Sequence, residues 1–260
     1  MITDSHCHLD KPPFAPDADQ VLARARAAGV GAFLVVGTSM ATARRTADFA
    51  SRHGDVLATV GVHPNHAAED GENPPPERLA TLATELNVVA LGETGLDFNR
   101  NRAPRDAQDA NFRRHIEAAL ATGLPLVIHN RDADDATMAL ADQADPQRRL
   151  RGVLHCFDGS RALAEWAIGR GLLVSCSGIL TYRRSEALRD IIRSLPLSSL
   201  MVETDAPYLS PEPMRAQRRN EPTNIVHTAA MLAHLHGITS DEAAMATTAN
   251  FDRLFRREPT

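Results

Sequence analysis

The chain has 260 residues, a formal net charge of −5, and Lys11 as its sole lysine among 28 basic residues. This acidic balance argues against wrapping nucleic acid by bulk electrostatics, which needs a basic surface. The start Met1-Ile-Thr-Asp4 lacks the basic and apolar parts of a signal peptide, and no apolar run reaches the roughly eighteen residues of a membrane span, so a cytoplasmic protein is expected.

Short apolar stretches alternate with Ala-, Leu- and Arg-rich stretches of helical character. Strands are predicted near 2–8, 31–36, 56–62, 88–92, 124–129, 152–157, 172–176 and 199–204. Helices are predicted near 18–28, 40–52, 76–86, 105–122, 133–144, 160–169, 184–194, 223–236 and 240–255. Eight such units in about 250 residues predict an α/β protein with a (β/α)8 TIM barrel. No linker-like run interrupts the chain, so residues 1–260 are expected to form a single domain.

The competing fold is a doubly wound open sheet. That fold usually has fewer strands and a glycine-rich first turn. The first turn here contains His6 and His8 and no GxGxxG pattern, which favours the barrel.

His6 and His8 stand two residues apart in the first predicted strand. Side chains at i and i+2 of a strand share a face, so both imidazoles are expected to point the same way. Cys7 alternates to the other face and is a poor ligand candidate, as is Cys156 beside His155. The three cysteines, the third being Cys176, are an odd number in predicted strands and are interpreted as reduced core thiols.

Four further residues of metal-binding type follow short apolar runs: Glu93, His129, His155 and Asp205. A polar residue where a buried parallel strand stops lies at the strand's carboxyl end, and these ends form the active-site face of a barrel. The candidate metal ligands are therefore His6, His8, Glu93, His129, His155 and Asp205.

Six ligands suit two ions better than one. Two divalent ions about 3.5–4 Å apart assist hydrolytic displacement, with Glu93 as the natural bridge and Asp205 orienting or deprotonating the attacking water. A carbamylated-lysine bridge is excluded because Lys11 does not end a middle strand. The oxygen ligands suit Mg²⁺ or Mn²⁺, and the four imidazoles also suit Zn²⁺.

His63 and Arg131 are candidate phosphate-binding residues, because each follows a predicted strand and can hydrogen-bond phosphate oxygens. A structural role is an equal alternative for His63 and the favoured one for Glu203, two residues before Asp205. Most arginines are expected on solvated helix faces. The group at 215, 218 and 219 is different, because it lies in the long loop after the last strand.

Eight sequence blocks, in order, resemble the TatD family of metal-dependent deoxyribonucleases. They are Asp4-Ser-His-Cys-His-Leu-Asp10, Gly61-Val-His-Pro64, Gly92-Glu-Thr-Gly-Leu-Asp97, Ile128-His-Asn-Arg-Asp132, His155-Cys-Phe-Asp-Gly159, Ser177-Gly-Ile179, Glu203-Thr-Asp-Ala-Pro-Tyr-Leu209 and Arg219-Asn-Glu-Pro222. The likeness extends nearly the whole length of the chain, to about Asn250-Phe-Asp-Arg-Leu-Phe255.

The resemblance implies a (β/α)8 barrel and a divalent-metal phosphodiesterase acting on DNA, often from the 3′ end, in DNA repair or degradation. It implies the same six ligands, with His63 and Arg131 near the substrate. Two residues depart from the family pattern: Asn65 stands where a histidine is usual, next to His66, and Asp158 replaces a usual serine.

Two other functions are considered. One is a metal-dependent hydrolase of a small amide, ester or lactone, or of aminoacyl-tRNA, because one barrel hosts many chemistries. The other is a catalytically silent scaffold, which the presence of all six ligand residues disfavours. Arg131 and the arginines at 215, 218 and 219, as phosphate-sized basic contacts, favour the phosphodiesterase. No membrane contact and no protein partner are readable from the sequence.

Overall fold

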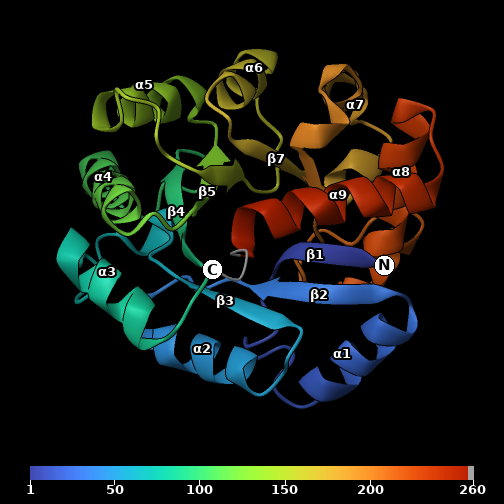
Figure 1. The fold of residues 1–260 in the computed structure, drawn as a ribbon, viewed down its shortest axis with the longest axis horizontal. Coiled ribbons are helices and arrows are strands. Elements are labelled where there is room, and N and C mark those ends of the chain that lie inside the picture. Colours follow the sequence, from blue (N-terminus) through green and yellow to red (C-terminus); the bar gives the residue numbers. More distant parts are fainter. Residues whose placement is uncertain (257–260) are drawn as a thin grey trace. The chain divides into compact units, whose positions relative to one another are not determined.

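The computed structural model describes residues 1–256, in which eight strands alternate with helices (Figure 1). These residues form two compact units, one of 1–35, 155–158 and 173 onward, and one of 36–154 and 159–172. The strands are β1 (Ile2–Cys7), β2 (Val30–Val35), β3 (Val56–Val60), β4 (Ala90–Asp97), β5 (Leu126–Arg131), β6 (Gly152–Leu154), β7 (Leu173–Cys176) and β8 (Leu200–Val202). The helices are α1 (Ala18–Ala27), α2 (Ala43–Ser51), α3 (Pro76–Glu85), α4 (Arg105–Thr122), α5 (Asp134–Ala144), α6 (Arg161–Gly169), α7 (Glu186–Ser194), α8 (Ile225–His236) and α9 (Ser240–Phe255).

The first unit contains the parallel pairs β1–β2 and β7–β8. The chain just beyond β8 joins β1, because the Asp205 N–H donates to the His6 carbonyl at 2.9 Å and the His8 N–H donates to the Ala206 carbonyl at 2.8 Å. Helix α9 contacts both β1 and β8. Every residue of β1 is buried, although four of its six side chains, Thr3, Asp4, Ser5 and His6, are polar.

The second unit contains β3, β4, β5 and β6 as successive parallel neighbours. Gly61 allows close approach at the end of β3, since a Cβ there would lie 2.5 Å from the Gly92 Cα. Helix α4 contacts β4 and β5, and its neighbours α3 and α5 contact α4. These helices bury one face of the sheet with mainly alanine, leucine and isoleucine side chains.

One predicted strand was wrong at its carboxyl end. The apolar run predicts residues 88–92, whereas β4 continues to Asp97. Gly92 and Gly95 adopt φ values of +119° and +136°, and a side chain at either position would collide with a β5 carbonyl. Glycines within a strand pattern can mark a β-bulge as well as the end of the strand. Here they mark a bulge, and β4 continues beyond it. The other predicted elements are confirmed, with bounds that differ by a few residues.

The cysteines are free thiols, as expected for reduced core residues. Burial raises the pKa of Cys7, Cys156 and Cys176, so each thiol stays protonated and unreactive at neutral pH. Among residues 1–256, no helix combines the length and the apolar character needed to cross a membrane.

Candidate metal centre

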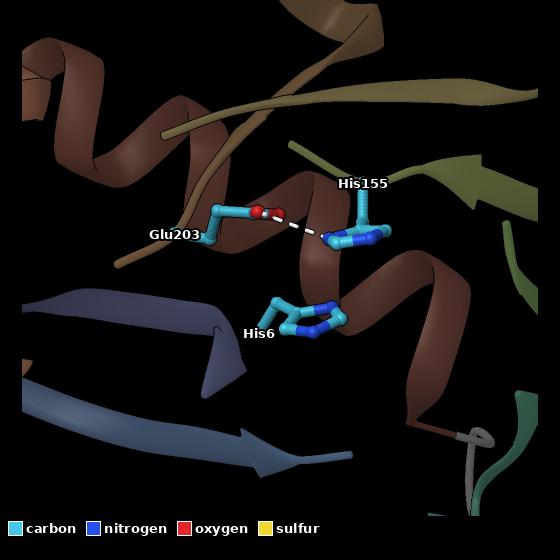
Figure 2. Close-up of side chains that lie close together, drawn as sticks. All are labelled: His6, His155 and Glu203. Carbon is cyan, nitrogen blue, oxygen red and sulfur yellow. Dashed lines mark hydrogen bonds and ion pairs between the residues drawn. The ribbon is translucent and has the colours of Figure 1, made fainter. Parts of the chain in front are cut away.

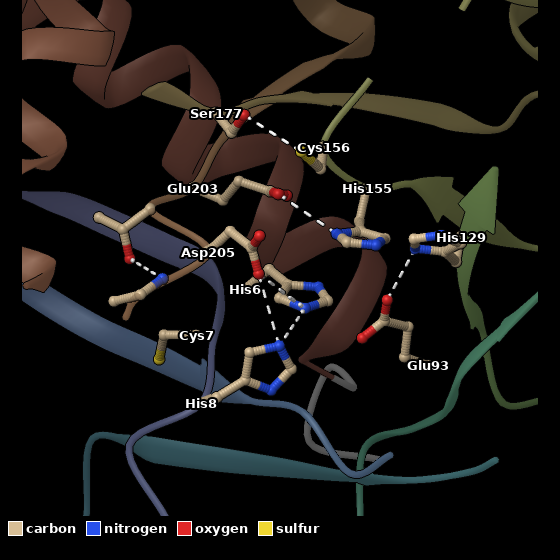
Figure 3. A network of polar contacts seen from close by, with 12 residues as sticks. His6, Cys7, His8, Glu93, His129, His155, Cys156, Ser177, Glu203 and Asp205 are labelled. Atoms are coloured by element: carbon tan, nitrogen blue, oxygen red, sulfur yellow. Dashed lines mark hydrogen bonds and ion pairs between the residues drawn. The ribbon is translucent and has the colours of Figure 1, made fainter. Parts of the chain in front are cut away.

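Three side chains of the first unit converge at the ends of β1 and β8 (Figure 3). The Nε2 atoms of His6 and His8 are 3.3 Å apart, which confirms that the two imidazoles share a face. Asp205 Oδ1 lies 3.7 Å from His6 Nε2 and 3.4 Å from His8 Nε2. His6 is fully buried and the side chain of Asp205 is 13% exposed, so the three atoms form a largely desolvated cluster.

The spacing of these three atoms is that of ligands around one divalent ion. Two ligand atoms bound tetrahedrally at about 2.0–2.2 Å from an ion lie about 3.3–3.6 Å from each other. Two imidazole nitrogens and a carboxylate oxygen are also ligands that Zn²⁺ and Mn²⁺ accept. His6, His8 and Asp205 therefore fit a metal ion by both geometry and chemistry.

His155 belongs to the same unit and lies directly beyond β6. Its ring stacks on that of His6 with centroids 3.9 Å apart, and its Nδ1 lies 3.3 Å from Glu203 Oε1 (Figure 2). Burial alone would raise the pKa of Glu203, but the hydrogen bond and charge of His155 outweigh it and hold that pKa below its usual value. An ionised Glu203 accepts a hydrogen bond from the Nδ1–H of His155. In this tautomer of the neutral ring, the Nε2 atom carries the lone pair that can bind a metal ion.

Glu203 thus lies where it can orient the His155 ring, and this role is a prediction beside the structural role favoured from the sequence. We expect Glu203→Gln to weaken metal affinity by about 10- to 100-fold, because an amide holds the imidazole tautomer less firmly than a carboxylate does. Competition with a chromophoric chelator measures this loss. Glu186→Gln, on the exposed face of α7, is the matched control and should leave affinity unchanged. Equal affinities in the Glu203 variant and the wild type would contradict the assignment.

Asp4 is a buried residue of this unit that sequence reasoning missed as a site component. Its carboxylate accepts hydrogen bonds from the Thr204 N–H at 2.9 Å and the Thr204 hydroxyl at 2.6 Å. Burial raises the pKa of Asp4 to about 7, although the Thr204 hydrogen bonds oppose that shift. These bonds tie β1 to Thr204, the residue between Glu203 and Asp205. The sequence could have indicated Asp4, because Asp4 and His6 are two residues apart in a strand and such side chains share a face.

Glu93 in the second unit is displayed by the β4 bulge. Leu91 pairs with Leu126 and Thr94 pairs with Ile128, so β4 uses one more residue than β5 over this stretch. A bulge of this kind redirects a side chain. The Glu93 N–H is held by the Gly37 carbonyl at 2.7 Å.

Two imidazoles meet the Glu93 carboxylate. Glu93 Oε1 lies 2.9 Å from His129 Nδ1, the contact drawn in Figure 3, and 3.3 Å from His63 Nε2. The shorter distance equals the spacing of adjacent ligands in an octahedral Mg²⁺ site, about 2.9–3.0 Å for bonds of 2.0–2.1 Å. His63 Nδ1 accepts the Asn65 N–H at 3.0 Å, which assigns the proton of the neutral His63 ring to Nε2, facing Glu93.

Asp97 is a second carboxylate beside His129, and sequence reasoning missed it. Asp97 Oδ2 lies 3.5 Å from His129 Nε2 and accepts a 2.8 Å hydrogen bond from Asn65 Nδ2. Burial would raise the Asp97 pKa, but the hydrogen bonds from His129, Arg100 and Asn65 outweigh it and keep the pKa well below its usual value. The parity of a strand puts Asp97 on the same face as Glu93, four residues earlier, and that signal could have identified it.

The Asn65 departure has a structural explanation. Asn65 is 8% exposed and bridges His63 and Asp97 through the two hydrogen bonds above. His66 does not take over this role, because its Nδ1 lies 2.7 Å from Glu69 Oε1. The His63 loop is also anchored by His115, whose Nε2 accepts the Val62 N–H at 3.1 Å. Burial lowers the pKa of His115 to about 4, despite its hydrogen bond to the Asn111 backbone, so it accepts as a neutral ring.

The arginines considered for phosphate binding differ in their surroundings. Arg131 ends β5 with an exposed side chain. Arg219 is already paired, at 2.8 Å from Asp17 and 2.7 Å from Glu221, which weakens the suggestion that the whole loop group binds phosphate. Asp158 is exposed in the first unit, and its effect on an approaching phosphate stays a prediction.

Of the six predicted ligands, the structure groups His6, His8, His155 and Asp205 in the first unit. It pairs Glu93 with His129 in the second. The distances bring together the residues that the strand-end pattern indicated in each unit, with Glu203 and Asp97 as carboxylate partners of the imidazoles.

Comparisons with known proteins identify the family to which this chain is similar. A family model described as "TatD related DNase" matches residues 3–256. The chain is 39% identical to the Escherichia coli (strain K12) "uncharacterized metal-dependent hydrolase YcfH" over 258 residues, which are 98% of this chain and 96% of the relative. It is 40% identical to the "3′-5′ ssDNA/RNA exonuclease TatD" of Enterobacter lignolyticus, with 97% of this chain and 98% of the relative covered.

The crystal structure of YJJV, a TatD homologue from Escherichia coli K12, superposes with a TM-score of 0.87 at 30% sequence identity. The superposition covers 99% of this chain and 98% of the homologue. The (β/α)8 barrel predicted from the strand–helix alternation is thereby confirmed.

Proposed function

Because the chain belongs to the TatD family of metal-dependent hydrolases, we propose that it is a divalent-metal-dependent phosphodiesterase that removes nucleotides from the 3′ ends of single-stranded DNA. The observation that carries the proposal is the convergence of His6, His8 and Asp205 at ligand spacing. The relative named a 3′-5′ ssDNA/RNA exonuclease supports the choice of substrate. We also propose that residues 1–260 act as one domain, of which 257–260 lie outside the described residues.

The metal ligands in this proposal are the six side chains identified from the sequence. They are His6, His8, Glu93, His129, His155 and Asp205. Divalent ions held there supply positive charge to the phosphate and promote ionisation of water. That two ions would bind is the prediction from ligand number, and Mg²⁺, Mn²⁺ and Zn²⁺ are the candidates.

Asp205 carries the proton transfer in this proposal. Its carboxylate lies 3.7 Å from His6 Nε2 and 3.4 Å from His8 Nε2 and keeps 13% of its side chain exposed, so one oxygen can accept a proton from an attacking water. Glu203 keeps His155 in one tautomer while this happens. In the second unit, Arg131 donates from its guanidinium to phosphate oxygens in this proposal, and His63 donates from the Nε2–H that it shares with Glu93.

The direct test uses purified protein stripped with a chelator and a 5′-labelled single-stranded DNA. We expect stepwise shortening from the 3′ end after addition of Mg²⁺, Mn²⁺ or Zn²⁺, and none in chelator or with the His6→Ala/His8→Ala variant. A single-stranded RNA of the same sequence measures DNA preference. If no nucleotide is released with any of the three ions, the nuclease proposal is wrong. Metal-dependent cleavage of a neutral ester or lactone would then favour a small-substrate hydrolase. If neither DNA nor these small substrates are cleaved, a catalytically silent scaffold would be favoured.

Arg131→Ala separates phosphodiesterase from esterase chemistry. We expect the KM for single-stranded DNA to rise about 10- to 150-fold, because a charge-assisted hydrogen bond to phosphate contributes roughly 1.5–3 kcal/mol. Cleavage of a neutral ester should not change. Arg151→Ala is the matched control, since Arg151 is an exposed arginine that precedes β6 rather than ending a strand. Equal KM values for DNA in wild type and Arg131→Ala would remove Arg131 from the substrate site.

A cytoplasmic location and a role in DNA repair or degradation stay predictions.

A further inference from the structure

Tyr208 is an aromatic side chain that the fold leaves exposed beside the first-unit ligands. Its relative exposure is 49%, and among the large hydrophobic residues exposed in 1–256 it is the only aromatic one; the others are Met1, Val226 and Met245. Its ring meets the His8 ring edge-on, with centroids 6.1 Å apart. An exposed tyrosine ring offers a planar apolar surface at low conformational cost, which suits ligand contact.

Backbone hydrogen bonds fix the main chain that carries this ring. The Tyr208 N–H donates to the Asp205 carbonyl at 2.8 Å, so the ring follows a tight turn that starts at a candidate metal ligand. The next part of the loop is fixed as well, because the Asn220 N–H donates to the Pro207 carbonyl at 3.0 Å and Asn220 is fully buried. The backbone at Tyr208 is therefore already ordered, and binding a partner does not require this loop to be ordered first.

Lys11 adds a cation to the same place. Its Nζ lies 5.8 Å from the centre of the Tyr208 ring, and its N–H donates to the His8 carbonyl at 3.1 Å. The chain's sole lysine and an exposed tyrosine are thus each tied by one backbone hydrogen bond to a candidate metal ligand. An aromatic face beside an ammonium group matches the two parts of a nucleotide, a planar base and an anionic phosphate.

We propose that Tyr208 and Lys11 form a nucleotide-binding subsite of the first unit, in which the Tyr208 ring stacks on a base near the 3′ end and Lys11 pairs with a backbone phosphate. This subsite rests on the proposed nuclease function and deepens it. Stacking on a ring accepts every base, since each has a π face, so the subsite favours single strands over duplexes without sequence preference. A paired base would first have to leave its stack.

The second tyrosine of the chain provides a contrast. Arg215 covers the Tyr182 ring, with its guanidinium carbon 3.7 Å from the ring centre, and Tyr182 is only partly exposed. That contact packs two elements of the protein against each other. Tyr208, with about half of its surface accessible, is the one that a substrate base can cover.

The test is a double-mutant cycle between the side chain and the base. Binding of fluorescent oligothymidylates by chelator-treated protein is followed by anisotropy. Four strands are compared: one intact strand, and three strands that each carry a single abasic residue, at the last, the second-last or the third-last 3′ position. We expect Tyr208→Ala to weaken binding of the intact strand about tenfold, and of one abasic strand less than twofold. Tyr208→Phe should bind like wild type. Met245→Ala removes a comparable exposed apolar side chain on α9 and should have no effect.

Lys11→Gln tests the phosphate contact separately. It should weaken intact and abasic strands alike and reduce the slope of log affinity against log salt by about 0.7. Equal weakening of all strands by Tyr208→Ala, or none, would overturn the stacking assignment, and an unchanged salt slope would overturn the Lys11 contact. Thermal melting of each variant excludes a folding defect. If wild type cleaves DNA but the cycle shows no coupling, only the subsite is wrong; if coupling is seen without cleavage, the proposed function is wrong and the subsite remains.

Discussion

Asp205→Asn is expected to lower kcat/KM for single-stranded DNA by about a hundred- to ten-thousandfold, the range for removal of a general base. Asparagine keeps the shape of the side chain but cannot accept a proton as a carboxylate does. It also replaces an anionic ligand by a neutral one at the point where Asp205 Oδ1 meets the Nε2 atoms of His6 and His8. Rates are measured at saturating metal, so that weaker binding of the ion is separated from slower chemistry.

The matched control for this variant is Asp190→Asn. Asp190 is an exposed carboxylate on α7, paired with Arg193 on the same helix, and its replacement should leave the rate within a factor of about two. Activity of Asp205→Asn equal to wild type at saturating metal would show that another group takes the proton.

Removal of metal is expected to lower the thermal stability of the protein by about 5–15 °C. An ion present at 100 to 1,000 times its dissociation constant stabilises the native state by about 2.7–4.1 kcal/mol, and 1 kcal/mol shifts the melting temperature of a chain of this size by about 2–4 °C. The ligands are nearly preformed, with His6 Nε2 and His8 Nε2 3.3 Å apart, so the binding energy is not spent on rearranging them. Melting curves with chelator and with added Mg²⁺, Mn²⁺ or Zn²⁺ measure the shift.

The His6→Ala/His8→Ala variant is the control for this measurement. It should melt at one temperature whether or not metal is present, because two imidazole ligands of the first unit are gone. Elemental analysis of gel-filtered wild-type protein should find two ions per chain. Trace metal in protein that remains active, or identical melting of stripped and loaded wild type, would be inconsistent with the predicted metal centre.

The candidate ligands could be identified from the sequence because their positions depend on local rules. Buried parallel strands are continuous apolar runs, so polar residues at their ends are visible in the sequence, as with His155 and Asp205. Strand parity placed His6 and His8 on one face, and the structure confirms that pairing at 3.3 Å. The alternation of strands and helices likewise determined the barrel class before any coordinates.

The partners of those ligands were decided by the tertiary structure. Glu203 contacts His155 across 48 residues of sequence, and Asn65 reaches Asp97 across 32, so each pair depends on the register of strands that are distant in the sequence. Apolar periodicity carries no information about that register. The pairing of Arg219 with Asp17 could not be predicted from composition either, since it joins residues 202 positions apart. This pairing neutralises the charge of an arginine that the sequence alone suggested for phosphate binding.

By itself, then, the sequence determined the class of fold and the side chains able to bind metal, because both follow from short-range patterns of apolar and polar residues. Only the tertiary structure decided how β4 bulges to display Glu93, which carboxylates orient the imidazoles, and which aromatic ring stays exposed beside His8. Those features depend on packing between segments far apart in the chain, where a shift of one residue turns a side chain to the opposite face.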